Sequence, residues 1–188
     1  MNLHFVDIHI RADTETPADT LLSALFGRLH QVLVHNGALH TAVTFPGYRL
    51  VPVMTLGTTM RLVGPKAQLQ ALPLDVWAED MEGEIDIMPM LSVPADVPHR
   101  TVRRAQSHSN VERMRRRQMR RHGITWEQAV DKIPATARKL LSLPHLDVES
   151  ASSKEIFRFF IKVGEEVEAA LGPTNAYGLS ATGTVPWF

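Results

Sequence analysis

Nine arginines gather in one short stretch of this 188-residue chain, and their spacing predicts the chemistry of its partner. Residues 100–122 contain these nine cations and one acid, Glu112, so the segment carries a net charge of +8. The rest of the chain carries −8, which makes the whole neutral. Segregated charge predicts a polyanionic partner at one face, while the acidic remainder opposes indiscriminate coating by nucleic acid. The nine are Arg100, Arg103, Arg104, Arg113, Arg115, Arg116, Arg117, Arg120 and Arg121.

Most of these arginines are predicted to lie on a helix over residues 110–122. Ser109 and Glu112 form a capping-box pattern at its start, and Gly123 provides its C-terminal stop. Four arginines at i, i+3, i+4 and i+7 share one face, where they repel each other unless a counter-charge such as a phosphate backbone is present. The stripe consists of Arg113, Arg116, Arg117 and Arg120, and a narrower face able to dock on the protein consists of Val111, Met114 and Gln118.

Other interpretations of this helix stay open on charge alone. It could be a solvated basic surface helix or a target segment of the kind that calmodulin binds. DNA recognition is a rival, although the sequence shows no zinc-ligand pattern, heptad repeat or helix-turn-helix spacing. The charge therefore indicates nucleic acid without indicating which kind.

Composition places the chain among globular proteins. Apolar residues make up 44% and charged residues 21%. Cysteine is absent, which excludes disulfides and thiolate metal sites, and no histidine–carboxylate spacing resembles a metal centre. The N-terminus lacks a signal-peptide pattern, and no stretch reaches the ~20 apolar residues that cross a membrane. We therefore expect a soluble, cytoplasmic protein with no membrane partner.

The first half of the chain is predicted to alternate strands and helices in the order β-α-β-β-α-β. This order is typical of the ferredoxin-like fold, in which two helices cover one face of an antiparallel sheet, and the predicted fold class is α+β. The expected strand-like runs are 3–10, 41–45, 48–56, 59–63 and 84–91, with a helix from the cap Thr16 to Asn36-Gly37 and another from Pro65 to about residue 72. Two of the runs can be joined across Pro46-Gly47, so the number of strands within residues 41–63 stays open.

Three prolines, Pro89, Pro94 and Pro98, mark a predicted domain boundary. It separates a ferredoxin-like domain, 1–95, from an RNA-binding region, 96–188, with a small sheet. Within the second region we expect a capping box at Thr125–Gln128 with a short helix to Pro134, a helix at 135–141, and strands at 146–150 and 156–163.

Several separated motifs resemble the type I-F (Csy-family) CRISPR endoribonuclease, and they agree with it in order and spacing. The resemblance covers nearly the whole chain and is loosest over residues 46–100. The motifs are Leu25-Phe26-Gly27-Arg28-Leu29-His30-Gln31, the run 104–113 (RAQSHSNVER) continuing to 119–122 (MRRH), Tyr177-Gly178-Leu179-Ser180, and Val185-Pro186-Trp187-Phe188.

This resemblance implies a defined activity. Members of the family cut the repeat of a CRISPR transcript at the base of an RNA hairpin, without metal or other cofactor, and leave a 2′,3′-cyclic phosphate and a 5′-hydroxyl. They stay bound to the hairpin in a surveillance complex with other type I-F Cas proteins. DNA is met only through that complex.

The resemblance also implies residue roles. His30 is the expected catalytic histidine, Ser150 the contact to the ribose, and Tyr177 the residue that orients the histidine. The arginine helix is expected in the major groove of the hairpin. The expected RNA-binding residues are Arg104, Gln106 and Arg117 as readers of base edges, Phe157 as a stacking ring, and Arg113, Arg116, Arg120 and Arg121.

The catalytic residue types suit this chemistry, although each has a structural alternative. Histidine has an ordinary pKa near neutrality, as a base for a 2′-hydroxyl requires, yet His30 could equally fill a helix–sheet seam. His108 and His122 flank the basic helix and are rivals by proximity. Ser150 could be part of a polar turn, and Ser152 and Ser153 are rivals for the ribose contact. Tyr177 could be a packing residue.

The expected RNA readers also suit their roles. Arginine pairs with guanine and glutamine with adenine, and we expect Arg104 and Gln106 in a linker before the helix. Phe157 alternates with Phe159, so one face of their strand is core, and an exposed ring there would be available for stacking. Glu149 departs from expectation as an acid close to the phosphates.

A non-catalytic RNA-hairpin-binding subunit and a DNA-binding regulator remain the alternative functions.

Overall fold

The computed structural model describes residues 2–11, 15–37, 40–106, 111–134, 141–150, 154–170 and 172–188, apart from the side chain of Asp75. The chain forms two compact units: unit 1 is 1–104 with 143–188, and unit 2 is 105–142. The predicted division after residue 95 is a functional one, between the part that carries His30 and the part expected to hold RNA. It remains a prediction.

The first sheet of unit 1 is antiparallel and is built around β1 (Leu3–Ile10), as predicted for residues 3–10. Its order is β2-β3-β1-β4, where β2 is Ala42–Thr44, β3 is Thr59–Pro65 and β4 is Ile85–Ile87. The predicted strand 84–91 is divided, because β4 and a short β5 (Leu91–Ser92) pair separately with β1. Helices and antiparallel sheets together agree with the predicted α+β class.

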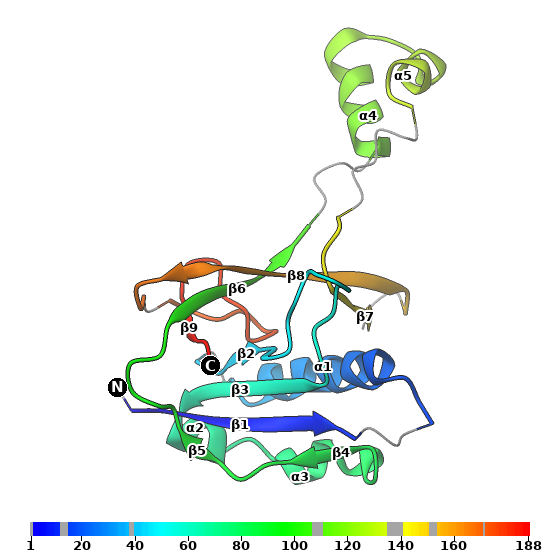
Figure 1. Ribbon diagram of the computed structural model, residues 1–188. Coiled ribbons are helices and arrows are strands. Elements are labelled where there is room, and N and C mark those ends of the chain that lie inside the picture. The colour runs from blue at the N-terminus through cyan, green and yellow to red at the C-terminus, as the bar shows by residue number, and fades with distance from the viewer. Residues whose placement is uncertain are drawn as a thin grey trace. The chain divides into compact units, whose positions relative to one another are not determined.

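The long helix α1 (Ala18–His35) follows β1 and buries the predicted apolar stripe (Figure 1). Pro17 is the residue that precedes its first turn, so the prediction of Thr16 as the cap is wrong; the Thr16 hydroxyl donates to Glu84 instead. Asn36 and Gly37 end the helix as predicted, with Gly37 at a φ of 59°. The buried stripe is Leu22, Leu25, Phe26, Leu29 and Leu33. Shorter helices follow β3: α2 (Lys66–Gln70), α3 (Leu74–Trp77) and a 3₁₀ turn (Glu79–Met81).

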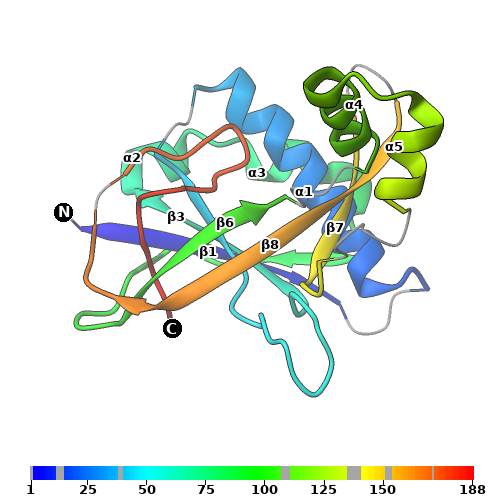
Figure 2. The same cartoon turned by 90° about the horizontal axis from the view of Figure 1, so that it is seen from above.

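The second sheet of unit 1 has the order β7-β8-β6-β9. Figure 2 shows β8 (Ile156–Val167) and β6 (His99–Ala105) side by side. β7 (His145–Glu149) pairs with β8 and packs against α1, while β9 (Val185–Pro186) pairs with β6. Arg104 therefore lies on strand β6, and the prediction of a linker there is wrong, because β6 pairs with β8 and β9 and buries Val102.

Residues 48–56 do not form the predicted strand. Only an isolated pairing of Arg49 with Thr55 interrupts a loop whose apolar side chains Val51 and Val53 are 79% and 66% exposed. The run is rich in apolar residues, but most of their side chains are exposed, and Pro52 removes one donor that a strand ladder requires.

Unit 2 contains two helices that pack on each other, α4 (Val111–His122) and α5 (Trp126–Lys132). The predicted stop at Gly123 is confirmed, with its N–H donating to the Met119 carbonyl at a φ of 61°. The capping box of Thr125 and Gln128 is also confirmed. The Ser109 cap and residues 135–140 of the predicted helix lie outside the described residues. None of the described helices is both long and apolar enough to span a bilayer.

A buried ion pair joins the first sheet to the end of the chain. Arg61 on β3 lies opposite Asp7 on β1, and its Nε and Nη2 donate to the two carboxylate oxygens at 2.6 and 2.8 Å. Its Nη1 donates to the Phe188 carbonyl at 2.7 Å, and its guanidinium lies over the rings of Phe5 and Phe188. The pair therefore holds the C-terminal segment, and with it β9, against β1 and β3.

Replacing Arg61 tests this anchor. Arg61→Met leaves the Asp7 carboxylate buried without its partner, so we expect the free energy of unfolding in urea to fall by about 3 kcal/mol. Arg11→Met is the matched control, because it breaks the exposed pair with Asp86 and should change stability little. Equal, small effects of the two substitutions would contradict an anchoring role for Arg61.

Candidate active site

His30 is held by the backbone of the C-terminal segment. Its Nδ1 lies 2.8 Å from the carbonyl oxygen of Ala176. A carbonyl only accepts hydrogen bonds, so Nδ1 carries the proton, and Nε2 of the neutral ring is the nitrogen able to accept one. Among the described residues, nothing hydrogen-bonds to Nε2. His30 is half-buried, and a Cβ built at Gly27, one turn earlier, would meet nothing within 4 Å. The geometry leaves open space on this helix face.

A tight turn at residues 175–179 presents that carbonyl. The Asn175 side-chain oxygen accepts the N–H groups of Tyr177 and Leu179, and the Leu179 carbonyl accepts the Asn175 N–H. Gly178 adopts a φ of 70°, and a Cβ there would lie 2.5 Å from a methyl of Val43. Glycine is therefore required twice, by the backbone conformation and by the close approach to β2.

Tyr177 stacks directly on His30. The two ring centres are 3.9 Å apart and the planes differ by 10°. The Tyr177 ring also packs against the rings of Phe26 and Phe159, with ring centres 5.6 and 4.7 Å away. The imidazole is thus restrained by one hydrogen bond and one aromatic face, which limits its rotation about χ2.

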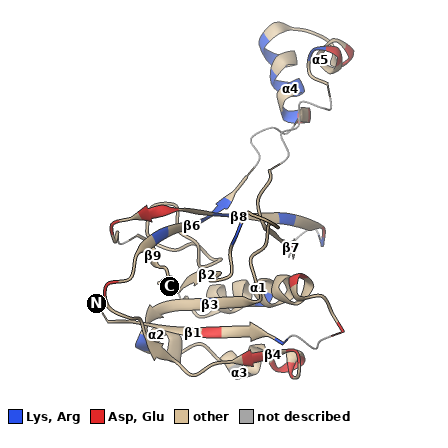
Figure 3. Ribbon diagram, in the orientation of Figure 1, with Lys and Arg blue, Asp and Glu red and all other residues tan. Residues whose placement is uncertain are grey.

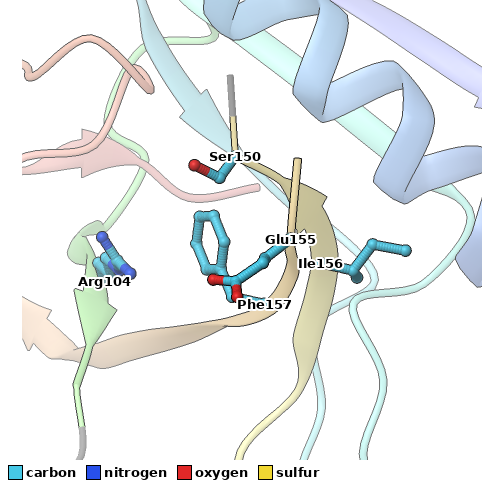
Figure 4. Close-up of a pocket in the computed structure, with 5 residues that line it drawn as sticks. All are labelled: Arg104, Ser150, Glu155, Ile156 and Phe157. Atoms are coloured by element: carbon cyan, nitrogen blue, oxygen red, sulfur yellow. The ribbon is translucent and has the colours of Figure 1, made fainter. Parts of the chain in front are cut away.

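A pocket of about 520 Å³ lies at the end of the second sheet, where β6, β7 and β8 meet. Its lining brings together three residues singled out from the sequence, Arg104, Ser150 and Phe157. Figure 4 shows the Phe157 ring standing between Arg104 and Ser150, whereas Ile156 points away from them. Glu155 is the acid in this pocket, while Glu149, the acid noted in the sequence, pairs with Lys154 at 3.2 Å.

Phe159 connects this pocket to the histidine. The Arg104 guanidinium lies 4.5 Å from the centre of the Phe159 ring and 5.3 Å from that of Phe157. Phe159 in turn contacts Tyr177, which covers His30. A continuous row of contacts therefore runs from Arg104 to His30 within unit 1. The sequence indicated Phe159 only as core, because alternation along a strand cannot tell which buried ring joins two functional side chains.

Ser150 follows β7 at the turn into β8. Its N–H donates to the Glu155 carbonyl, and its carbonyl accepts the Lys154 N–H, both at 2.9 Å. These bonds place the residue at the pocket and agree with the turn that was one interpretation of this serine. Ser152 and Ser153, its rivals, lie outside the described residues, as does His108.

The arginines of α4 are presented within unit 2. Arg113, Arg116, Arg117, Arg120 and Arg121 are all exposed, and Figure 3 shows the basic residues along this helix. Arg115 has a different role: its Nε donates to the Ile133 carbonyl, and its guanidinium lies 5.8 Å from the centre of the Trp126 ring. Arg115 is therefore part of the face of α4 that contacts the α5 segment. Of the predicted docking face, Val111 and Gln118 are half-buried, whereas Met114 is 36% exposed.

Gln106 and the arginines of α4 are the other residues expected to bind RNA. Gln106 is exposed at the start of unit 2. Among Arg117, Arg120 and Arg121, no side chain makes an ion pair with any described residue, while Arg116 contacts Glu112 at 3.4 Å. In the described part of the chain, no group of three histidine or acidic side chains could hold a metal ion.

Comparison with known proteins assigns the family. The family model described as "CRISPR-associated protein (Cas_Csy4)" matches residues 5–188. The chain belongs to this Csy4 family. Two relatives are named "CRISPR-associated endonuclease Cas6/Csy4": one from Pseudomonas aeruginosa (strain UCBPP-PA14) is 40% identical, and one from Escherichia coli (strain UTI89 / UPEC) is 35% identical. Each alignment covers 98% of this chain and 99% of the relative.

A solved structure, "Csf5, CRISPR-Cas type IV Cas6 crRNA endonuclease", aligns over 99% of both chains with a TM-score of 0.33 and 11% identity. This likeness is too distant to inform the fold or the site. The assignment of the chain to the Csy4 family rests on the family model and the two relatives.

The contact between Tyr177 and His30 can be tested without any substrate. Ring currents of a stacked aromatic shield the imidazole protons, so Tyr177→Leu should move the His30 proton resonances downfield in NMR spectra. Tyr177→Phe keeps the ring and should leave these resonances nearly unchanged. Identical spectra of the His30 ring in both variants would mean that the stack is not formed in solution.

Proposed function

We propose that this Csy4-family protein is an endoribonuclease that cleaves CRISPR precursor RNA at the base of the repeat hairpin. The observation that carries the proposal is the hydrogen bond from His30 Nδ1 to the Ala176 carbonyl, which leaves Nε2 as the accepting nitrogen of a restrained imidazole. The relatives named as CRISPR-associated endonucleases, aligned over nearly the whole chain, support the same activity.

The proposed reaction needs no metal or other cofactor. His30 Nε2 takes the proton of the ribose 2′-hydroxyl next to the cut, and the resulting oxygen attacks the adjacent phosphorus. The P–O5′ bond breaks as the new P–O2′ bond forms. The products are a 2′,3′-cyclic phosphate and, once the leaving oxygen gains a proton, a 5′-hydroxyl. Base catalysis of this kind requires only a positioned group with a suitable pKa.

Two further residues, Tyr177 and Ser150, are proposed to position this chemistry. Tyr177 orients the imidazole, which the 3.9 Å stack supports. Ser150 contacts the ribose upstream of the cut, and its place in the pocket beside Phe157 favours this role. The row of contacts through Phe159 supports a site in which the pocket and the histidine act on one RNA.

The hairpin is proposed to be held by two kinds of contact. Phe157 is half-buried and borders an open pocket, so part of its ring is available to stack beneath the closing base pair, while Arg104 and Gln106 read base edges near the foot of the stem. The exposed arginines of α4 enter the major groove at the open end of the short stem and neutralise phosphates. These are Arg113, Arg116, Arg117, Arg120 and Arg121.

Further aspects of the proposal concern fold and setting. The antiparallel order β2-β3-β1-β4 with α1 and α2 supports a ferredoxin-like fold for residues 1–95, followed by an RNA-binding region. After cleavage the protein keeps the hairpin of the crRNA within a type I-F complex with other Cas proteins, meets DNA only through that complex, and acts in the cytoplasm.

Replacing the histidine separates cleavage from binding. His30→Ala should abolish cleavage of a repeat hairpin in the presence of chelator, and should change hairpin affinity by less than about 1.4 kcal/mol, a factor of ten. His35→Ala, at an exposed position of the same helix, is the matched control and should cleave normally. Both product ends are analysed by mass spectrometry. Tight binding by the wild-type protein without a cyclic-phosphate product would instead indicate a non-catalytic hairpin-binding subunit.

Replacing an arginine of α4 tests the proposed groove contact. Arg117→Gln should weaken hairpin binding by about tenfold and reduce the salt dependence of binding by roughly one phosphate contact. Lys132→Gln removes an exposed cation from α5 in the same unit and should have little effect. A defect confined to cleavage, with unchanged hairpin affinity, would argue against groove binding by Arg117.

A further inference from the structure

The second sheet has a solvent-facing side that the proposed reaction does not use. Along β8 the side chains of Phe159 and Ile161 are buried, so those of residues 158, 160 and 162 face the opposite side. On β6 the buried Val102 places Arg103 on that same outer side. We call this surface the outer face. Its basic residues are Arg103, Arg158 and Lys162, all exposed.

Two of these cations are neighbours across strands. Residue numbers rise along β6 as those of their contacts on β8 fall. Arg100 pairs with Glu166, Thr101 closely approaches Gly164, and Arg104 lies over Phe159. The strands are therefore antiparallel. Lys162 stands two residues before Gly164, and Arg103 two residues after Thr101, so their side chains lie next to each other on the outer face.

The positive charge of the outer face is largely uncompensated. None of its three basic side chains makes an ion pair with a described residue. The acids nearest in register are on β7: Asp147 lies opposite Arg158, while Glu149 is already paired with Lys154. The acidic residues Glu165 and Glu166 lie near the other end of β8, where Figure 3 shows a red segment. Adjacent like charges on a sheet destabilise it, so a counter-charge from outside would relieve the repulsion.

Aromatic side chains lie among these cations. Phe160 stands between Arg158 and Lys162 on the outer face and is only half-buried. Its cross-strand neighbour is the exposed His145, with ring centres 5.3 Å apart. A row of cations beside aromatic rings is the combination that binds single-stranded nucleic acid, because phosphates meet the cations while bases stack on the rings. A merely solvated face has no need of a phenylalanine at its centre.

We propose that the outer face binds single-stranded RNA that adjoins the repeat hairpin, an inference that rests on the proposed function. The pocket expected at the foot of the stem and the outer face share their strands: Arg104 and Phe157 line the pocket, while the next residues, Arg103 and Arg158, face outward. A single strand of RNA that leaves the stem at this end of the sheet reaches the outer face directly. Arg103, Lys162 and Phe160 form its contact.

The test compares two RNAs that cannot be cut, because a 2′-deoxy nucleotide replaces the nucleophile at the cleavage site. One is the bare repeat hairpin, and the other carries an unstructured single-stranded extension at the 5′ or 3′ side. The full-length protein is compared with the double variant Arg103→Gln/Lys162→Gln. The control Arg49→Gln/Lys66→Gln removes two exposed cations elsewhere on unit 1.

The extension on one side should raise wild-type affinity about tenfold, and the double variant should lose most of this gain while binding the bare hairpin normally. Its plot of log affinity against log salt concentration should be shallower by roughly 1.4, since each single-strand phosphate contact contributes about 0.7. Phe160→Leu should weaken binding of the extended RNA at least about fivefold, whereas Phe160→Tyr should retain it.

The proposal is overturned if neither extension raises wild-type affinity, or if the double variant loses no more than the control. A surface made for a protein partner would produce this result. Failure of the proposed function is recognised by a different result: the wild-type protein would neither bind nor cleave a repeat hairpin that keeps its 2′-hydroxyl. In that case, equal binding of an unstructured RNA by the wild type and the double variant would still overturn the assignment of the outer face.

Discussion

A single hydrogen bond, from the imidazole of His30 to the Ala176 carbonyl, determines how the rest of the site can work. Because a carbonyl cannot donate, this bond selects the tautomer in which Nε2 is the basic nitrogen. The bond joins α1 to a segment 146 residues away, so it depends on the turn at residues 175–179. That turn depends in turn on the side chain of Asn175 and on a glycine at position 178, where the backbone has a positive φ and contacts β2. The orientation of the His30 imidazole thus depends on tertiary contacts of the C-terminal segment.

Aromatic packing extends this constraint across unit 1. Phe26 and Phe159 are buried, and Tyr177 lies against both while it covers His30. Arg104 approaches the same cluster from β6. A rigid hydrophobic layer beneath a catalytic group restricts its rotamers, and an arginine on the edge of that layer keeps its charged end accessible to a ligand. The same core that stabilises the fold therefore also sets the positions of His30, the proposed base, and of Arg104, which is expected to read the RNA.

The parts of the fold that could be predicted from the sequence are those with local signals. The stripe of α1, the alternation in β1, the stop at Gly123 and the capping box at Thr125 are all encoded within a few residues. The failures are non-local. Residues 48–56 are rich in apolar residues but form no strand, whereas residues 99–105 are rich in arginine and polar groups and still form β6 because β8 and β9 pair with it. The buried Arg61 and the contact between Ala176 and His30 require knowledge of strand register and chain return.

Charge segregation has a structural consequence that differs between the two units. In unit 1, Arg61 is buried and donates to the Asp7 carboxylate and the Phe188 carbonyl, so it contributes to stability and is not available to a partner. On α4, Arg115 contacts the Ile133 carbonyl and the Trp126 ring, and the exposed arginines around it repel one another along the helix. Because helix propensity offsets such repulsion only weakly, α4 needs α5 and its capping box to stay formed without a ligand. A polyanion bound by α4 would then add stability by supplying the missing counter-charge, and its binding would be thermodynamically coupled to the folding of unit 2.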